Sequence, residues 1–345
     1  AVRMAASCGR RLDDACPVVD ATLPDGTRLN AVLPPLSADG TLICLRTKRR
    51  SAFTLGQLVE AGTVAPGLDS VLAALIETRA SCLITGATGT GKTTLLAALL
   101  GLVSATERIV CIEEAAELRP DHPHVLHLQE RGDNVQGVGA VPMSALVRTA
   151  LRMRPDRIVL GECRGPEVRD VLTALNTGHE GGWATLHANS PADVPARLTA
   201  LGALAGLDET AVAAQAVSAL DAVIHLRRSG ATGGGIAGRR SPREGTAERS
   251  STRGSDGPDS CASPEQDVMS SRSSRTRRYV SGIGMLRRGA QGSLVCEDAL
   301  IVALDGAAGT VCAVSAGPAV DRLAERIGAA PVAAAMKGGT SWTPL

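Results

Sequence analysis

A glycine-rich segment that ends in lysine and threonine is the part of the chain whose residue types and spacing most clearly specify chemistry. Residues 86–93 match the phosphate-binding pattern G-x-x-x-x-G-K-[ST]. Glycines let backbone N–H groups close around phosphate oxygens, and the start of a following helix adds partial positive charge. The predicted nucleotide-binding residues are Gly86, Ala87, Thr88, Gly89, Thr90, Gly91, Lys92, Thr93 and Thr94.

The side chains of this loop predict ATP and Mg²⁺ as cofactors. Lys92 is expected to bridge the β- and γ-phosphates, and the Thr93 hydroxyl is expected to ligate Mg²⁺ beside water and phosphate oxygens. Thr94 is expected to pack within the helix. None of the three lysines, Lys48, Lys92 and Lys337, lies in the Asn/Thr-Lys-x-Asp motif that selects guanine, which argues against a GTP switch.

Two apolar runs end in carboxylates that could act on a nucleotide bound by this loop. Residues 109–112 lead into Glu113, and residues 158–161 lead into Glu162. The ligand crevice of an open α/β sheet lies at the carboxyl ends of its strands, so both glutamates are expected to converge on the nucleotide. Glu162 is the candidate metal ligand together with Thr93. A purely structural carboxylate is the alternative for each glutamate.

The elements that position these residues alternate between strand and helix. Hydrophobic periodicity predicts strands at 82–84, 108–113, 157–161, 184–187 and 222–227, and helices at 68–80, from about 92, and at 143–153, 166–176, 191–204 and 208–220. This alternation is typical of an α/β sheet with helices on both faces. The predicted division is a small β-containing domain at 1–62 and the P-loop domain at 63–228.

The chain changes character after residue 228. Between 229 and 278 the large apolar residues are Ile236, Val268 and Met269 alone, so this segment is predicted to be a disordered low-complexity insertion. The last part, 279–345, is expected to form a hairpin from 279–286 and 293–303, a short helix near 318–327 and an unstructured tail.

Composition narrows the class of protein. The net charge is +1 and aromatic residues make up 1% of the 345 residues, which disfavours stable binding of nucleic acid by a basic, aromatic channel. Nine cysteines without a C-x-x-C pair indicate reduced, buried thiols in a cytosol. No apolar run approaches the roughly 18 to 20 residues of a membrane span. A cytoplasmic location is therefore expected.

Four segments together resemble the ATPases of type II and type IV secretion systems. They are the P-loop, the acidic residues 113–118, the run 150–165 and the two histidine-containing stretches within 176–189. The similarity covers about residues 8–228 and is greatest to the tight-adherence (Tad) pilus and conjugal-transfer-associated branch. It implies a RecA-like P-loop NTPase domain preceded by a small, partial α+β N-terminal domain.

The resemblance also implies roles for the polar residues. It implies that Glu113 is the water-polarising base and that Glu162 is the ligand of Mg²⁺-bound water or the alternative base. It also implies that His179 and His187 sense the nucleotide. The family's acidic box usually reads Glu-Asp, whereas this chain has glutamate at Glu114 as well.

The N-terminal residues carry a further implication of the resemblance. Arg28 and Arg46 lie in segments similar to the family's N-terminal domain, whose arginines reach the γ-phosphate when two domains close. Members of the family are usually longer at this end, so part of that domain is expected to be missing.

The function implied is that of a Mg²⁺-dependent ATPase motor, hexameric, which powers pilus assembly, protein secretion or conjugal transfer. It would act at the cytoplasmic face of the inner membrane through membrane-embedded platform proteins, with no stable nucleic-acid partner. Two alternatives stay open: a nucleic-acid motor of the same fold, and a nucleotide-binding scaffold that does not hydrolyse.

Overall fold

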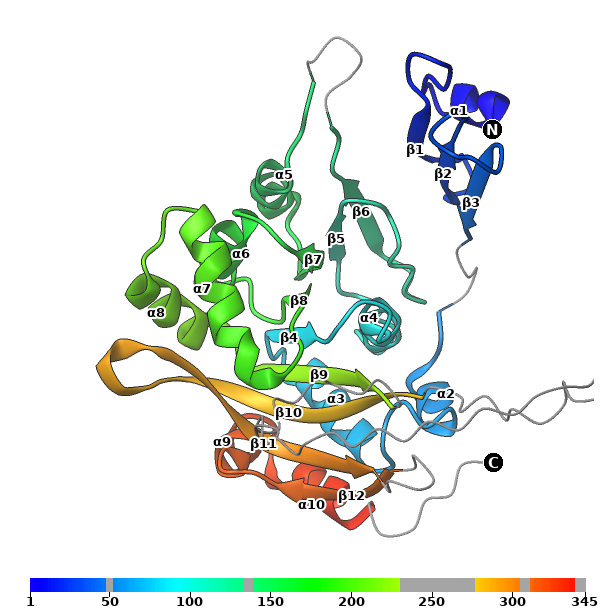
Figure 1. Cartoon of the computed structure of the whole chain (residues 1–345). Coiled ribbons are helices and arrows are strands. Elements are labelled where there is room, and N and C mark those ends of the chain that lie inside the picture. The colour runs from blue at the N-terminus through cyan, green and yellow to red at the C-terminus, as the bar shows by residue number, and fades with distance from the viewer. Residues whose placement is uncertain (48–51, 133–138, 230–276, 305–310, 339–345) are drawn as a thin grey trace, which may run out of the picture.

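Two β-sheets organise the described part of the chain (Figure 1). The computed structural model describes residues 1–47, 52–132, 139–229, 277–304 and 311–338. Within these ranges the sheets have three and nine strands, and the smaller one lies in a separate N-terminal unit beside the main body. No helix in these ranges has the length and apolar character needed to cross a bilayer.

The N-terminal unit, residues 1–47, is a short antiparallel sheet with one helix against it. Alternating burial in its first two strands places Val19, Ala21, Leu29 and Ala31 in a small core with residues of the helix. Strands two and three pair in register, Arg28 opposite Arg46, so both arginines lie at one end of the sheet. The elements are α1 (Val2–Ser7), β1 (Val18–Thr22), β2 (Arg28–Val32) and β3 (Leu42–Arg46).

The large sheet has the strand order β12-β11-β10-β9-β4-β8-β7-β5-β6. The six strands from β9 to β6 run parallel, and β10 to β12 continue the sheet antiparallel. The bounds are β4 (Cys82–Thr85), β5 (Ile109–Glu113), β6 (Val125–Gln129), β7 (Arg157–Cys163), β8 (Trp183–Leu186), β9 (Ala222–Arg228), β10 (Arg278–Arg288), β11 (Leu294–Leu304) and β12 (Val311–Ala316).

Helices cover both faces of this sheet (Figure 1). One core contains side chains of α2 (Leu55–Glu60), α3 (Leu68–Glu77), α4 (Lys92–Leu100), α9 (Val320–Ile327) and α10 (Ala329–Gly338). The other contains side chains of α5 (Met143–Ala150), α6 (Glu167–Asn176), α7 (Val194–Leu204) and α8 (Glu209–Ala219). Short 3₁₀ turns occur at Leu151–Met153, Pro191–Asp193 and Ala290–Gly292.

The central strands are apolar throughout because both of their faces are covered. Residues of β4, β5 and β8 are buried along the whole strand. In β4, Cys82 and Ile84 belong to one core and Leu83 to the other, as strand alternation requires. The α/β class with helices on both faces, predicted from sequence, is confirmed at this level.

Several parts of the chain differ from the sequence expectation, among them β6 and β12, which were not expected as strands. The hairpin of β10 and β11 forms, yet it pairs with β9 and continues the large sheet. The tail is not wholly unstructured, because α10 packs its buried Ala335 into the core near α3. α2 belongs to the large core rather than to the N-terminal unit, and a reciprocal capping box between Thr54 and Gln57 fixes its start.

Two further expectations, for the segment 229–278 and for the cysteines, can be compared with the structure only in part or hold only in part. The segment 229–278, predicted to be disordered, lies outside the described residues except for its ends, where Ser229 bonds with Arg277 and Arg278 begins β10. The cysteines were expected to be buried. Cys82, Cys111 and Cys163 are, but Cys16 and Cys44 are exposed.

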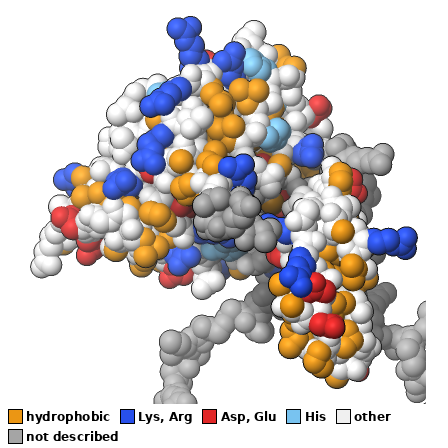
Figure 2. Space-filling view, turned by 90° about the horizontal axis from the view of Figure 1, so that it is seen from above, with side chains coloured by type: hydrophobic (Ala, Val, Ile, Leu, Met, Phe, Trp, Pro, Cys, Tyr) orange, Lys and Arg blue, Asp and Glu red, His pale blue; other side chains and the backbone are white. Residues whose placement is uncertain are grey.

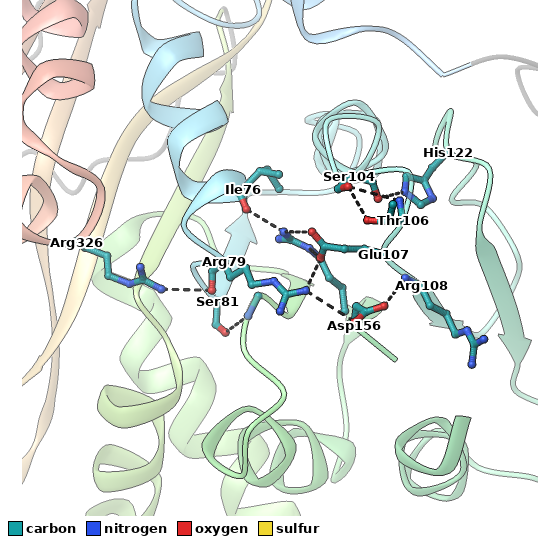
Figure 3. Close-up of polar contacts among 12 residues, drawn as sticks. Ile76, Arg79, Ser81, Ser104, Thr106, Glu107, Arg108, His122, Asp156 and Arg326 are labelled. Carbon is teal, nitrogen blue, oxygen red and sulfur yellow. Dashed lines mark hydrogen bonds and ion pairs between the residues drawn. The ribbon is translucent and has the colours of Figure 1, made fainter. Parts of the chain in front are cut away.

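A network of charged side chains secures the amino-terminal edge of the sheet (Figure 3). Arg157, at the start of β7, is 2% exposed and donates Nε to Glu107 at 2.9 Å and Nη2 to the Ile76 carbonyl at 2.9 Å. Arg79 donates to the same Glu107 carboxylate at 2.8 Å. Burial raises the pKa of Glu107, but these hydrogen bonds outweigh it and leave the pKa lowered.

Replacing Glu107 with alanine is expected to lower the free energy of unfolding by about 3–5 kcal/mol, because the buried Arg157 charge loses its partner. Equilibrium denaturation in urea measures this, with Glu77→Ala, an exposed glutamate of α3, as the control. Since the Glu107 pKa is lowered in the folded state, its contribution should be present above the ordinary carboxyl pKa and lost on acidification. A loss below about 1 kcal/mol would contradict this account.

Candidate nucleotide site

The P-loop follows β4 and leads directly into α4. Gly89 and Gly91 adopt φ of +74° and +99°, and Gly91 is the residue before the helix. A β-carbon on Gly86 would lie 2.5 Å from the Leu226 carbonyl oxygen, so this position accepts only glycine. Such a turn directs successive backbone N–H groups toward one centre, which is the geometry of an anion-binding nest.

The Lys92 side chain folds back onto the phosphate-binding loop. Its Nζ donates to the carbonyl oxygens of Gly86 at 2.9 Å and Ala87 at 3.1 Å. Burial lowers the pKa of Lys92, and the carboxylate of Glu162 acts in the opposite direction. Thr90 is buried and its hydroxyl donates to the Ala87 carbonyl at 2.8 Å, so it shapes the loop.

A cleft of about 480 Å³ lies over the P-loop at the carboxyl ends of the strands. It brings together residues from the N-terminal unit, the P-loop, β5, β7 and the segment after β8. The predicted site residues that line it are Arg28, Arg46, Thr88, Gly89, Gly91, Lys92, Thr93, Thr94, Glu113, Glu162 and His187.

Glu113 ends β5 with a fixed and buried carboxylate. The residue is 3% exposed, and its Oε1 accepts hydrogen bonds from the backbone N–H groups of Glu117 at 2.9 Å and Leu118 at 2.8 Å. Its Oε2 is buried and has no hydrogen-bond partner among the described residues, although His127 Nδ1 lies 3.7 Å away. One oxygen is therefore held, and the other has no hydrogen-bond partner among the described residues.

Glu162 and His187 meet beside Lys92. His187 Nε2 lies 3.2 Å from Glu162 Oε1, and His187 Nδ1 lies 3.4 Å from Lys92 Nζ. Burial and the Lys92 charge lower the pKa of His187, while Glu162 raises it. The three side chains place a carboxylate, an imidazole and an ammonium group in contact with the P-loop.

Close packing between β5 and β7 sets the position of Glu113. A β-carbon on Gly161 would lie 2.7 Å from Glu113 Cγ, well inside normal contact. The Gly161 carbonyl accepts a 2.5 Å hydrogen bond from the Thr185 hydroxyl, so its backbone is itself held. Glycine at this position allows the carboxylate to reach the cleft.

Under the ATPase function expected from the sequence, the variant Gly161→Ala should lower kcat for ATP by about tenfold to a hundredfold, because Glu113 must move aside. Affinity for ATP should stay within about twofold of wild type, since the P-loop is untouched. Steady-state kinetics and equilibrium binding separate the two quantities. Gly132→Ala is the control because a β-carbon there meets nothing within 4 Å. Unchanged kcat in Gly161→Ala would show that Glu113 does not need this space.

The arginines of the N-terminal unit face the same cleft from the other side. Arg46 Nη2 lies 3.3 Å from Glu117 Oε2, and Arg28 Nη2 lies 3.5 Å from Asp20 Oδ2. Arg46 thus touches the acidic segment whose backbone holds Glu113. Both arginines are close to the cleft within one chain.

His179, a predicted site residue, lies away from the cleft. It precedes β8, whereas His187 follows it, so the two histidines lie at opposite edges of the parallel sheet. His179 does not line the cleft, and its Nδ1 is buried without a hydrogen-bond partner among the described residues. The sequence spacing of eight residues concealed this separation, because an entire buried strand lies between them.

Sequence reasoning missed two residues of the site. Phe53 and Arg278 line the cleft, although Arg278 had been assigned to the low-complexity insertion. Arg164, which also lines the cleft, pairs with Glu114 at 2.7 Å. Behind the P-loop strand, His225 Nδ1 lies 2.8 Å from the Thr85 hydroxyl. Burial and the Arg227 charge lower the pKa of His225 to about 4, so it is neutral near pH 7.

Three further histidines, His122, His124 and His127, lie close together in the sequence. His122 contacts the Ser104 carbonyl, His124 contacts Arg108, and His127 lies near Glu113. Across the described ranges no group of three or more His, Cys, Asp or Glu side chains is placed to hold a metal ion. Any Mg²⁺ at the cleft would therefore rely on phosphate oxygens and water for most of its ligands.

Comparison with known proteins assigns the chain to a family. The family model described as "Type II/IV secretion system protein" matches residues 2–271. Rv3659c of Mycobacterium tuberculosis strain H37Rv, a protein named for conjugal transfer, is 52% identical over 234 residues, which cover 66% of this chain and 66% of that protein. The type IV secretion system protein PtlH homolog of Bordetella bronchiseptica is 36% identical over 218 residues, or 56% of this chain and 63% of the relative.

Among solved structures, the VirB11 ATPase of the Brucella suis type IV secretion system, in complex with sulphate, is similar with a TM-score of 0.41 and 25% identity, covering 68% of this chain and 76% of that one. The chain belongs to the type II/IV secretion system protein family. Its match spans about two thirds of the length of the Mycobacterium relative.

Proposed function

We propose that the chain is the Mg²⁺-dependent ATPase subunit of a secretion, pilus or conjugal-transfer machine. The observation that carries this proposal is the cleft in which the P-loop lysine, Glu113 and Glu162 meet. A conformationally fixed nest for phosphates and two carboxylates at neighbouring strand ends are the parts that phosphoryl transfer to water requires. Family membership supports the same assignment.

Within this site the P-loop would bind the phosphate chain, with Lys92 between the β- and γ-phosphates. Thr93 and Glu162 would hold Mg²⁺, Glu162 through a bound water. Bound Mg²⁺ supplies charge neutralisation on the β- and γ-phosphate oxygens. The residues fit this group because Thr93 and Glu162 line one cleft, and because Glu162 contacts His187 and its charge raises the pKa of Lys92.

Glu113 is assigned as the base that orients the attacking water. Its Oε2 makes no hydrogen bond with the described residues, and in this role it would accept a hydrogen bond or a proton from the attacking water. Its Oε1 is fixed by two N–H groups, which keeps the carboxylate in one orientation. His187 is assigned to sensing the γ-phosphate through its contacts with Lys92 and Glu162. His179 could take such a role only outside this cleft.

The quaternary and cellular parts of the proposal rest on the family. We infer a hexameric ring, most similar to the tight-adherence pilus branch, that works at the cytoplasmic face of the inner membrane through membrane-embedded platform proteins. Arg28 and Arg46 would reach the γ-phosphate when the N-terminal unit closes on the P-loop unit. Their presence at the cleft supports this role.

A nucleic-acid motor of the same fold receives less support. The face in Figure 2 has basic side chains as separate spots among apolar and uncharged ones, without a continuous stripe. The net charge of +1 adds no general attraction to phosphate backbones. We therefore assign protein or pilin export, with conjugal transfer through platform proteins, as the work of the motor.

Mg²⁺-dependent ATP turnover of the purified chain tests the proposal, measured across protein concentrations. Turnover per chain is expected to rise with concentration, because neighbouring subunits complete a ring. Binding without any turnover at high concentration would instead identify a nucleotide-binding scaffold. A salt-sensitive shift of DNA together with DNA-stimulated turnover would favour the nucleic-acid motor.

A further inference from the structure

Two arginines at the end of the β9–β10 pair nearest the P-loop have been given no chemical role so far. Arg228 is the last residue of β9, and Arg278 is the first residue of β10. The two residues are directly paired across the antiparallel strands, so their side chains leave the same face. Both are exposed.

This pair lies against the phosphate-binding loop. A β-carbon built on Gly89 would lie 3.9 Å from Arg228 Nη1, and one built on Gly91 would lie 3.7 Å from Arg278 Cδ. Arg278 also lines the cleft that contains Lys92. The Arg228 guanidinium and the Arg278 side chain therefore lie beside the two glycines whose positive φ values shape the nest.

The charges of the pair are not compensated within the described chain. Neither guanidinium makes an ion pair or a side-chain hydrogen bond with any described residue, whereas Arg79, Arg157, Arg164 and Arg326 all have carboxylate partners. Like charges directly opposite each other destabilise a strand pair. Two opposed cations beside an anion-binding loop are therefore explained by an anionic ligand.

We propose that Arg278 and Arg228 form a clamp that binds the phosphate chain of the nucleotide on the outer side of the P-loop. The inference rests on the proposed function, since it takes the ligand of the P-loop to be a nucleoside polyphosphate. Arg278, which lines the cleft, makes the larger contribution, and Arg228 the smaller. A planar guanidinium presents two parallel N–H donors to phosphate oxygens, which lysine cannot reproduce.

Equilibrium binding of ATP and of inorganic tripolyphosphate, both with Mg²⁺ at low salt, tests the clamp. Tripolyphosphate has no base or ribose, so it reports the phosphate contacts alone. Arg278→Gln is expected to weaken both ligands by about tenfold, and Arg228→Gln by a few-fold, as expected for charge-assisted hydrogen bonds. Arg278→Lys should restore only part of the loss. Arg288→Gln, an exposed arginine at the far end of β10, is the matched control and should bind like wild type.

A second measurement separates binding from folding. Because the pair is mutually repulsive without ligand, Arg278→Gln should leave the Tm of the nucleotide-free protein unchanged or raised, whereas a structural arginine would lower it. Unchanged affinity for both ligands, or a loss for ATP but not for tripolyphosphate, would overturn the clamp. If wild type binds neither ligand, the proposed function fails as well, and that outcome is visible before any variant is made.

Discussion

Lys92→Ala is expected to reduce ATP turnover to the level of a blank and to weaken ATP binding by about a hundredfold to ten-thousandfold. The ammonium group is enclosed by the loop and donates to the carbonyl oxygens of Gly86 and Ala87, which places it where a phosphate would arrive. Each charge-assisted hydrogen bond to a phosphate contributes about 1.5–3 kcal/mol, and this lysine would make two. Among the described residues, no other lysine lines the cleft.

Binding of a fluorescent ATP analogue and steady-state turnover measure both effects, with Lys337→Ala on α10 as a control away from the cleft. Burial lowers the pKa of Lys92, so wild-type affinity should fall as pH rises, at a lower pH than for an exposed lysine, while the alanine variant stays flat. Undiminished ATP affinity in Lys92→Ala would show that the loop does not bind the phosphates.

Glu162→Gln is expected to keep ATP binding and to lower kcat by about a hundredfold or more. Glutamine preserves the shape and the contact with His187, 3.2 Å away, but removes the negative charge that would hold Mg²⁺-bound water. The loss should appear in single-turnover experiments, so that product release cannot hide it. Glu209→Gln, at the exposed start of α8, is the control. A kcat within about twofold of wild type would remove Glu162 from the chemistry.

Comparing this variant with Glu113→Gln separates a metal ligand from a base. Both should lose turnover, but the Mg²⁺ concentration for half-maximal activity should rise in Glu162→Gln alone. Glu113→Gln should instead keep the metal dependence of wild type, because its carboxylate is held by backbone N–H groups of Glu117 and Leu118 and would act on water. An unaltered metal dependence in Glu162→Gln would reverse the two assignments.

The central sheet could be predicted because its signals are local. Apolar runs such as 109–112 are buried on both faces, and a buried parallel strand must be apolar throughout. The P-loop combines a fixed spacing with a strand before it and a helix after it. The carboxylates follow from the rule that strand ends meet at one edge, and Glu113 and Glu162 line one cleft.

The rest depended on contacts distant in sequence. His179 and His187 lie close in the chain, but the strand between them separates them by the depth of the sheet. The pairing of β10 with β9 joins residues about fifty positions apart. The segment between them has no hydrophobic periodicity, so no local pattern predicts this pairing. Arg278 was missed for that reason. The edge strand β6 was missed because its burial is partial and irregular.

The contact between Arg46 and Glu117 has a kinetic consequence under the proposed function. Glu117 donates its backbone N–H to Glu113, so the orientation of the proposed base is linked to the N-terminal unit by two successive contacts. Arg46 is 71% exposed, and ion pairs of this kind contribute about 1 kcal/mol or less. An ion pair of this strength shifts the equilibrium between the contacting and released positions of the N-terminal unit by only about fivefold. Such a contact can form and break in every catalytic cycle. Movement of the small unit can then set the timing of hydrolysis without ever having to break a strong bond.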